Sequence, residues 1–204
     1  MRIFRAGPSA VLIEWADGSG VAAAYRLLDA ARKQGRLRAT EIVPAARTVL
    51  VDGVAGTDQI RTLLTEATTA PPPATGPSRV IEIPTVYDGA DLDDVAQWWG
   101  TDRAGVVAVH TGTAFRVAFC GFAPGFAYLT GLGPEHHVPR RATPRTRVPA
   151  GTVALAGAYS GVYPGASPGG WQCIGRTAAV LFDLENEPPA LLTPGATVRF
   201  VVAA

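Results

Sequence analysis

A proline-rich segment near residue 75 limits how this chain can fold. Residues 69–78 read TAPPPATGPS, with three consecutive prolines. Proline lacks a backbone N–H and fixes φ, so such a run favours extended polyproline II and is excluded from a helix or a central strand. We therefore predict a linker over residues 71–78, which joins one domain over 1–70 to a second over 79–204. The 204 residues are enough for a sizeable core.

The segment before the linker combines strand and helix patterns. Apolar residues at helical spacing predict one helix after residue 20 and a second over 58–67. Short apolar runs bounded by turn residues predict strands over residues 1–6, 10–15, 42–44 and 47–51. The order ββαββα predicts a small α+β domain with one sheet and its helices on one face.

The segment after the linker is dominated by strand patterns. One strand is expected over residues 79–84, followed by short helices over 91–99 and 102–110. From residue 114 onward, short apolar runs alternate with Gly/Pro turns. These runs cover residues 114–120, 152–157, 178–183 and 197–202. The pattern predicts a closed or nearly closed β-barrel.

Charge is distributed unevenly although the formal net charge is only +1. Residues 80–102 contain six acidic residues and no Lys or Arg, whereas residues 103–182 contain seven arginines and one acid, Glu135. This asymmetry predicts either pairing between the two segments or an anion site. The small net charge gives no reason to expect a nucleic-acid or membrane partner.

Several classes of site are disfavoured by the residues present. The only lysine, Lys33, lies in the first predicted helix, so no nucleotide P-loop is possible, and neither G-x-S-x-G nor H-E-x-x-H occurs. Two isolated cysteines and three histidines predict no metal site and no disulfide. The N-terminus lacks the apolar region of a signal peptide, and no apolar run approaches membrane-spanning length. We expect a cytoplasmic protein.

The most unusual stretch is residues 119–177, where aromatic residues, Pro and Gly surround a basic segment over 140–147. Arginine suits bidentate recognition of carboxylate or phosphate, so Arg145 is a candidate catalytic clamp. His110 is a candidate acid or base. The alternatives are solvated or paired arginines and a partly buried histidine at a helix end. Candidate substrate-binding residues are Phe122, Pro124, Gly125, Phe126, Tyr128, Arg140, Tyr163, Ser167, Gly169, Gly170 and Trp171.

The same aromatic and glycine clusters have a structural interpretation. Glycine permits close backbone approach, proline fixes turns, and the aromatic rings would fill one end of a barrel. The functional interpretation is a pocket for a flat small molecule, and the two are compatible.

Three motifs in this stretch resemble one known family. They are G-F-x-P-G-F-x-Y-L over 121–129, P-R-x-x-x-P-R-x-x-V-P-A-G over 139–151 and G-V-Y-P-x-x-S-P-G-G-W-x-x-I-G-R-T over 161–177. The combination resembles the carboxyltransferase family once called allophanate hydrolase subunit 1. Its members include the B subunit of 5-oxoprolinase and the kinase inhibitor KipI. Many relatives read Q-T-G-I-Y-P where this chain has Ala158 to Pro164, so an amide that could touch ligand is absent.

The resemblance implies a ferredoxin-like N-terminal domain followed by a cyclophilin-like barrel. It also implies the B subunit of an ATP-dependent 5-oxoprolinase, which opens 5-oxo-L-proline to L-glutamate and works only as a heteromer with a paralogous C subunit, helped by a separate A subunit. ATP, with Mg²⁺, is then a co-substrate, and the other substrate is a small carboxylate. The alternatives are a KipI-like inhibitor of a sensor histidine kinase and a member of a urea- or allophanate-metabolising complex.

Overall fold

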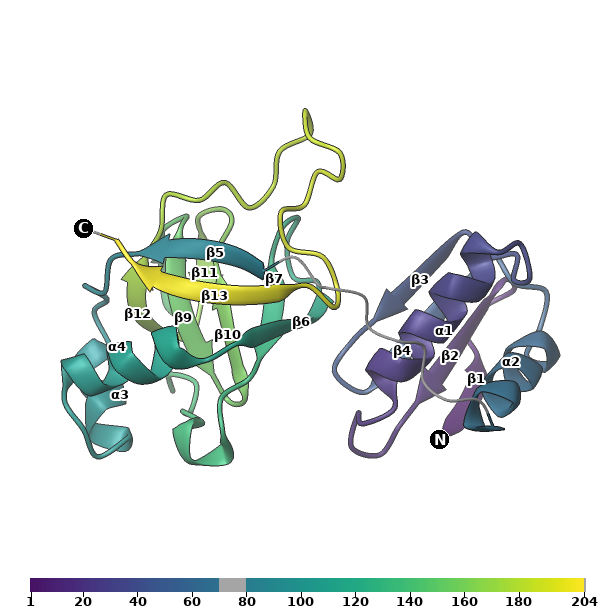
Figure 1. Cartoon of the computed structure of the whole chain (residues 1–204), viewed down its shortest axis with the longest axis horizontal. Coiled ribbons are helices and arrows are strands. Elements are labelled where there is room, and N and C mark those ends of the chain that lie inside the picture. The colour runs from purple at the N-terminus through teal and green to yellow at the C-terminus, as the bar shows by residue number, and fades with distance from the viewer. Residues whose placement is uncertain (70–79, 204) are drawn as a thin grey trace. The chain divides into compact units, whose positions relative to one another are not determined.

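A computed structural model describes residues 1–69 and 80–203 of the chain (Figure 1). The chain divides into two compact units, residues 1–77 and 78–204, which are taken separately below. The predicted linker over 71–78 lies outside the described residues. The predicted domain limits at residues 70 and 79 stay predictions.

The first unit has the predicted order ββαββα. Its elements are β1 (Arg2–Arg5), β2 (Ala10–Glu14), α1 (Val21–Lys33), β3 (Glu41–Pro44), β4 (Thr48–Asp52) and α2 (Asp58–Thr69). The strands form an antiparallel sheet in the order β1-β2-β4-β3.

Alternation along these strands builds the core of the first unit. Val49 and Val51 of β4 are fully buried, as is Ile13 of β2, whereas the residues between them are partly exposed. Leu28 of α1 and Ile60 of α2 belong to the same apolar cluster, so both helices cover one face of the sheet. Ferredoxin-like chains run βαββαβ, and the ferredoxin-like name therefore stays a prediction for this ββαββα chain.

The second unit is mainly β, with two helices and one short 3₁₀ turn among its described residues. Its helical elements are α3 (Leu92–Trp98), α4 (Arg103–Gly112) and η1 (Pro134–His136). Its strands are β5 (Val80–Thr85), β6 (Phe115–Cys120), β7 (Ala127–Thr130), β8 (Arg145–Val148), β9 (Thr152–Ala156), β10 (Tyr159–Val162), β11 (Ser167–Gly169), β12 (Gln172–Arg176) and β13 (Thr197–Val202).

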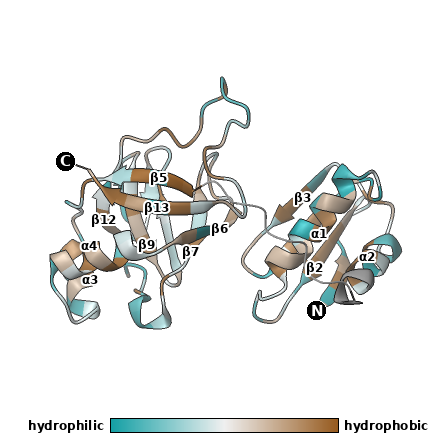
Figure 2. Cartoon of the chain, viewed as in Figure 1, coloured by the Kyte–Doolittle hydropathy of each residue, from teal (hydrophilic) through white to brown (hydrophobic). Residues whose placement is uncertain are grey.

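Seven of these strands form a barrel-like sheet in the order β12-β9-β10-β7-β6-β13-β5. The two edge strands meet at one antiparallel bridge, where Val86 and Arg176 exchange backbone hydrogen bonds of 2.9 and 2.8 Å. The barrel is therefore nearly closed, as predicted, and is consistent with the cyclophilin-like barrel that the resemblance implies. Hydrophobic residues colour parts of β5 and β13 brown (Figure 2), and the charged residues Glu82 and Arg199 interrupt them. Ile83 and Phe200 from these strands are fully buried.

The prediction of a strand over 178–183 is wrong. This segment is a loop that makes a single bridge, between Phe182 and Ala190. Within this run, Leu181 is buried in the barrel core, Phe182 is partly buried and Val180 is exposed. The apolar residues here place one side chain, Leu181, in the core, and in the described part of the chain they do not pair with a neighbouring strand beyond the single bridge.

The acidic segment reaches the basic one through α3. The start of α3 lies against β12, because the backbone N–H of Asp91 donates to the carbonyl of Cys173 at 2.9 Å. A Cβ at Gly89 would come within 2.3 Å of the same carbonyl oxygen, so only glycine allows this approach. Asp91 is thereby inserted between α3, β12 and the arginine segment.

Candidate functional site

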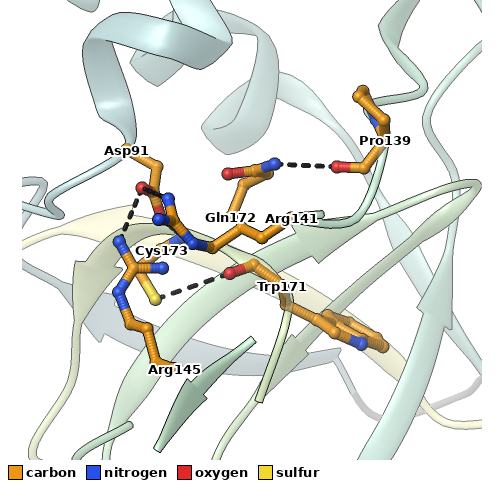
Figure 3. Close-up of polar contacts among 7 residues, drawn as sticks. All are labelled: Asp91, Pro139, Arg141, Arg145, Trp171, Gln172 and Cys173. Atoms are coloured by element: carbon orange, nitrogen blue, oxygen red, sulfur yellow. Dashed lines mark hydrogen bonds and ion pairs between the residues drawn. The ribbon is translucent and has the colours of Figure 1, made fainter. Parts of the chain in front are cut away.

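Asp91 is the centre of a buried ion network (Figure 3). Its side chain is 2% exposed, and Oδ1 accepts from Arg141 Nη1 at 2.9 Å and from Arg145 Nη2 at 2.7 Å. Oδ2 accepts from the backbone N–H of Cys173 at 2.6 Å. One carboxylate thus connects α3, β8, β12 and the loop before β8. The predicted pairing of the acidic and basic segments is confirmed at this point.

The environment keeps Asp91 ionised. Burial by itself would raise the pKa of this carboxyl, but hydrogen bonds from Arg145 and the Cys173 N–H outweigh it. The positive charges of Arg145 and Arg141 act in the same direction, so the pKa of Asp91 lies below its usual value.

Polar atoms without a partner surround this network. Within the described part of the chain, Arg141 Nε, Arg145 Nη1, Ser167 Oγ and Gln172 Oε1 are buried and lack a hydrogen bond. Gln172 is 2% exposed, and its Nε2 donates to the carbonyl of Pro139 at 2.8 Å, which fixes the orientation of the amide (Figure 3). Such unpaired buried groups are costly and mark candidate ligand contacts.

An aromatic pocket of about 370 Å³ opens beside the arginine segment. Its walls include Tyr128, Tyr159 and Trp171, and its lining is completed by Val138, Pro139, Arg140, Ala156 and Gly157. Tyr128 stacks on Phe119 at a ring distance of 4.3 Å and meets Tyr159 and Trp171 edge-on, at 5.6 Å each. These contacts hold the rings in place, and a pocket with flat aromatic walls suits a flat molecule.

A second pocket of about 350 Å³ shares Arg140 with the first. It is lined by Asp94, Trp98, Arg140, Arg141, Ala142, Thr143 and Gln172. Arg140 is exposed and forms no hydrogen bond or ion pair with the described residues. It is therefore available to a ligand in either pocket.

The structure brings together some of the predicted substrate-binding residues. Tyr128, Arg140 and Trp171 line the aromatic pocket. Phe126 and Tyr163 are buried behind it, where Phe126 meets Trp171 and Tyr163 at right angles. These two rings support the wall of the pocket without lining it.

Other predicted substrate-binding residues shape the backbone around the site. Gly169 lies opposite Arg145 in the β8–β11 pair, and a Cβ on it would come within 2.3 Å of the Tyr163 hydroxyl oxygen. The carbonyl of Gly170 accepts from the backbone N–H of Arg141 at 2.8 Å, which anchors the arginine segment. Ser167 lies on β11 with its hydroxyl unpaired among the described residues.

The loop that contains Pro124 and Gly125 packs against Leu181 and Phe182 and takes no part in either pocket. Gly125 has φ +82°, a conformation that favours glycine. Phe122 also has positive φ, at 75°, and is 63% exposed. A non-glycine residue in this region is strained.

Arg145 does not lie where a residue that clamps a ligand carboxylate or phosphate would be expected. It contacts Asp91 and lines neither pocket. Arg140 and Arg141, in contrast, line pockets. A catalytic role for Arg145 stays a prediction, and in this arrangement it positions Asp91.

His110 lies inside the barrel, away from both pockets. It is fully buried, and its ring nitrogens contact the Tyr87 hydroxyl at 2.7 Å and Ser160 Oγ at 2.9 Å. The rings of Phe115 and Phe200 pack against it at 4.9 and 4.3 Å. Burial lowers its pKa to about 3. This is the geometry of a neutral core histidine, and a catalytic role stays a prediction.

His110 should make stability depend on pH. The unfolded chain takes up the proton near pH 6.5, whereas the folded chain does so only near pH 3. Stability should therefore be lost as pH falls below about 6.5. Between pH 7 and pH 5, the wild-type unfolding free energy should fall by roughly 2 kcal/mol more than that of His110→Gln. Equal losses in denaturant titrations would contradict this assignment.

Three residues of the site were missed from the sequence. Asp91 was one of six acids in a segment, and Gln172 and Tyr159 stood in runs without a motif of their own. The charge asymmetry between segments was the only signal for Asp91. Gln172 and Tyr159 are identified by the strands β12 and β10, which place them beside the arginine segment and the aromatic pocket.

The fold and the site together define a protein with a β-barrel unit, in which an aromatic pocket lies beside paired arginines. The chain belongs to the family described as carboxyltransferase domain, subdomain C and D, whose model matches residues 1–192. No helix in the described part of the chain has both the length and the apolarity to cross a membrane.

Relatives from several bacteria are named as the B subunit of 5-oxoprolinase. The protein from Escherichia coli O157:H7 is 52% identical over 127 residues, which cover 61% of this chain and 58% of that protein. The Haemophilus influenzae protein is 49% identical over 127 residues, 61% and 60% of the two chains. The Bacillus subtilis protein is 43% identical over 126 residues, 60% and 52%. The matches thus span between half and three-fifths of these relatives.

Solved structures share the fold. TTHA0988 has a TM-score of 0.79 at 32% identity, over 96% of this chain and 40% of that one. PH0987 from Pyrococcus horikoshii has a TM-score of 0.58 at 32% identity, over 99% and 97% of the two chains. The K. lactis urea amidolyase has a TM-score of 0.68 at 19% identity, over 99% of this chain and 15% of that one, and shows the fold alone.

Proposed function

We propose that this chain is the B subunit of an ATP-dependent 5-oxoprolinase, which opens 5-oxo-L-proline to L-glutamate together with its C and A subunits. The observation that carries the proposal is the 52% identity to the Escherichia coli O157:H7 protein named as the B subunit of 5-oxoprolinase. With ATP as co-substrate, the proposed assembly belongs in the cytoplasm.

The aromatic pocket supports this substrate class. 5-Oxo-L-proline is a compact five-membered lactam with one carboxylate. We place its ring against the Tyr159 and Trp171 side chains and its anionic end against the Arg140 guanidinium, since Arg140 is the one cation among the described residues that line this pocket. A guanidinium with five N–H donors binds a carboxylate in two places and orients the ring.

The chemistry explains why ATP is needed. An amide carbon is a poor electrophile, and phosphorylation of the lactam oxygen makes that carbon reactive toward water. The protein's contribution to phosphoryl transfer is positioning and stabilisation of negative charge. Arg140 supplies positive charge in the aromatic pocket and Arg141 supplies it in the neighbouring pocket, and no nucleophilic side chain is required.

The experiment that tests this proposal is reconstitution. The chain and its C and A partners are purified separately, and 5-oxo-L-proline-dependent release of phosphate is measured for every combination. Turnover by the complete set, and its loss when this chain is omitted, is the expected result. A complete set without turnover would overturn the assignment.

Neither alternative function gains support from a specific observation. The likeness to the K. lactis urea amidolyase is at 19% identity and concerns the fold. A KipI-like kinase inhibitor would require a surface for a kinase, and the residues gathered at the site are those of a small-molecule pocket.

We also propose that residues 1–69 form a permuted ferredoxin-like domain. Moving the first strand and helix of a βαββαβ chain to its C-terminal end yields the order ββαββα found here. The antiparallel sheet with both helices on one face supports this description.

A further inference from the structure

Arg140 lines both pockets of the site, and the second pocket differs chemically from the first. The aromatic pocket is mostly apolar, whereas the second contains two guanidinium groups, a hydroxyl, a carboxylate and an amide. Trp98, which is 45% exposed, adds one flat apolar surface to it. A lactam of modest size occupies only the first pocket, so the second pocket is open to another ligand.

Unpaired polar atoms indicate what kind of ligand fits there. Gln172 Oε1 and Arg141 Nε are buried without partners among the described residues, and both residues line the second pocket. The first is an acceptor and the second a donor. A bare anion would satisfy only the arginine. A phosphate group accompanied by metal-bound water or a hydroxyl would satisfy both.

The charges around the second pocket also favour a phosphate ligand with a bound metal ion. Arg140, Arg141 and Arg145 face two carboxylates, Asp91 and Asp94, which leaves one positive charge in excess. Asp91 is already occupied by Arg141 and Arg145. Asp94 forms no ion pair with the described residues. Magnesium that accompanies a phosphate substrate is bound by one or two protein carboxylates together with the phosphate oxygens.

We propose that the second pocket binds the phosphate groups of a magnesium–nucleoside triphosphate. Arg140 and Arg141 hold the phosphate oxygens, and the Thr143 hydroxyl donates to them. Asp94 holds the metal, and the Gln172 amide oxygen accepts from metal-bound water. Trp98 offers a surface on which a base stacks. This inference rests on the proposed function, since it gives the nucleotide a place beside the substrate.

The shared arginine places the two ligands next to one another. In the transfer, the lactam carbonyl oxygen forms a bond to the γ-phosphorus while the bond from phosphorus to the bridging oxygen breaks. The electron pair of that bond leaves with the nucleoside diphosphate. Arg140 touches the substrate on one side and the phosphate on the other, where negative charge is spread during transfer.

Isothermal titration of the full chain, alone and mixed with its partners, separates the two pockets. Asp94→Ala and Thr143→Val should weaken Mg·ATP about tenfold or more and leave the Kd of 5-oxo-L-proline unchanged. Tyr159→Leu should weaken binding of 5-oxo-L-proline and leave the Kd of Mg·ATP unchanged. Arg140→Gln should weaken binding of both ligands. Arg199→Gln removes an exposed arginine that lines neither pocket and should change neither affinity.

The outcomes distinguish this inference from the proposed function. Mg·ATP that fails to bind in any mixture, or that binds Asp94→Ala and Thr143→Val with wild-type affinity, overturns the nucleotide pocket even if reconstituted turnover is observed. Absence of 5-oxo-L-proline turnover overturns the proposed function even if these variants weaken Mg·ATP. Thermal melts of each variant verify that an altered Kd does not arise from unfolding.

Discussion

Replacing Arg140 with glutamine is expected to reduce 5-oxo-L-proline-dependent ATP turnover by the assembled complex about 100-fold or more, the size of loss seen when one preorganised donor is removed from a reacting centre. Arg140 is the residue that lines both pockets. Because it is exposed and makes no hydrogen bond or ion pair with the described residues, the variant should melt at the wild-type temperature. Phosphate release and thermal melts are the two measurements.

The matched variants make this result specific. Arg140→Lys retains the charge but loses the bidentate geometry, and should recover only part of the turnover. Arg199→Gln should retain wild-type turnover, since this arginine lies on β13 outside both pockets. Turnover at the wild-type rate in Arg140→Gln would exclude this role for Arg140 and would leave Arg145 as the candidate catalytic arginine.

Replacing Asp91 with alanine is expected to lower the unfolding free energy of the barrel by about 3 kcal/mol, because it leaves two guanidinium groups without their carboxylate. It also removes the acceptor of the Cys173 N–H, so β12 and the start of α3 lose a shared contact. Urea titration measures the loss. Asp93→Ala breaks an ion pair with Arg103 whose side chains are 68% and 62% exposed, and should leave the midpoint close to wild type.

The pKa of Asp91 gives the same prediction a pH signature. Because the pKa is lower in the folded chain, the stabilisation is present above the unfolded value near 3.9 and is lost as pH falls through the folded value. The difference in stability between wild type and Asp91→Ala should therefore shrink below about pH 4. A difference that stays constant down to about pH 2.5, well below the unfolded value, would show that Asp91 acts through packing alone.

Much of the fold is predictable because it is encoded locally. Period-two burial along β2 and β4, the helical spacing of α1 and the turn residues between them follow from neighbouring side chains. The barrel was predicted from its apolar runs, but β7, β8 and β10 to β12 lie within the Gly- and Pro-rich stretch, outside the runs that predicted strands. Gly161 and Gly175 lie in strands where another backbone or ring approaches closely, which a local pattern does not reveal.

The site is less predictable because it depends on contacts between distant residues. Four arginines within eight residues look equivalent in the sequence. Asp91, 54 residues before Arg145, distinguishes them by binding Arg141 and Arg145 and leaving Arg140 exposed. His110 likewise appeared as a possible acid or base until Ser160, 50 residues away, accounted for one ring nitrogen.

A crystal structure of the assembled complex with 5-oxo-L-proline would locate the substrate directly. We predict electron density for the lactam between Tyr159 and Trp171, with its carboxylate against the Arg140 guanidinium. Density for the lactam only in a partner chain, with the aromatic pocket of this chain filled by water, would contradict the proposed binding site.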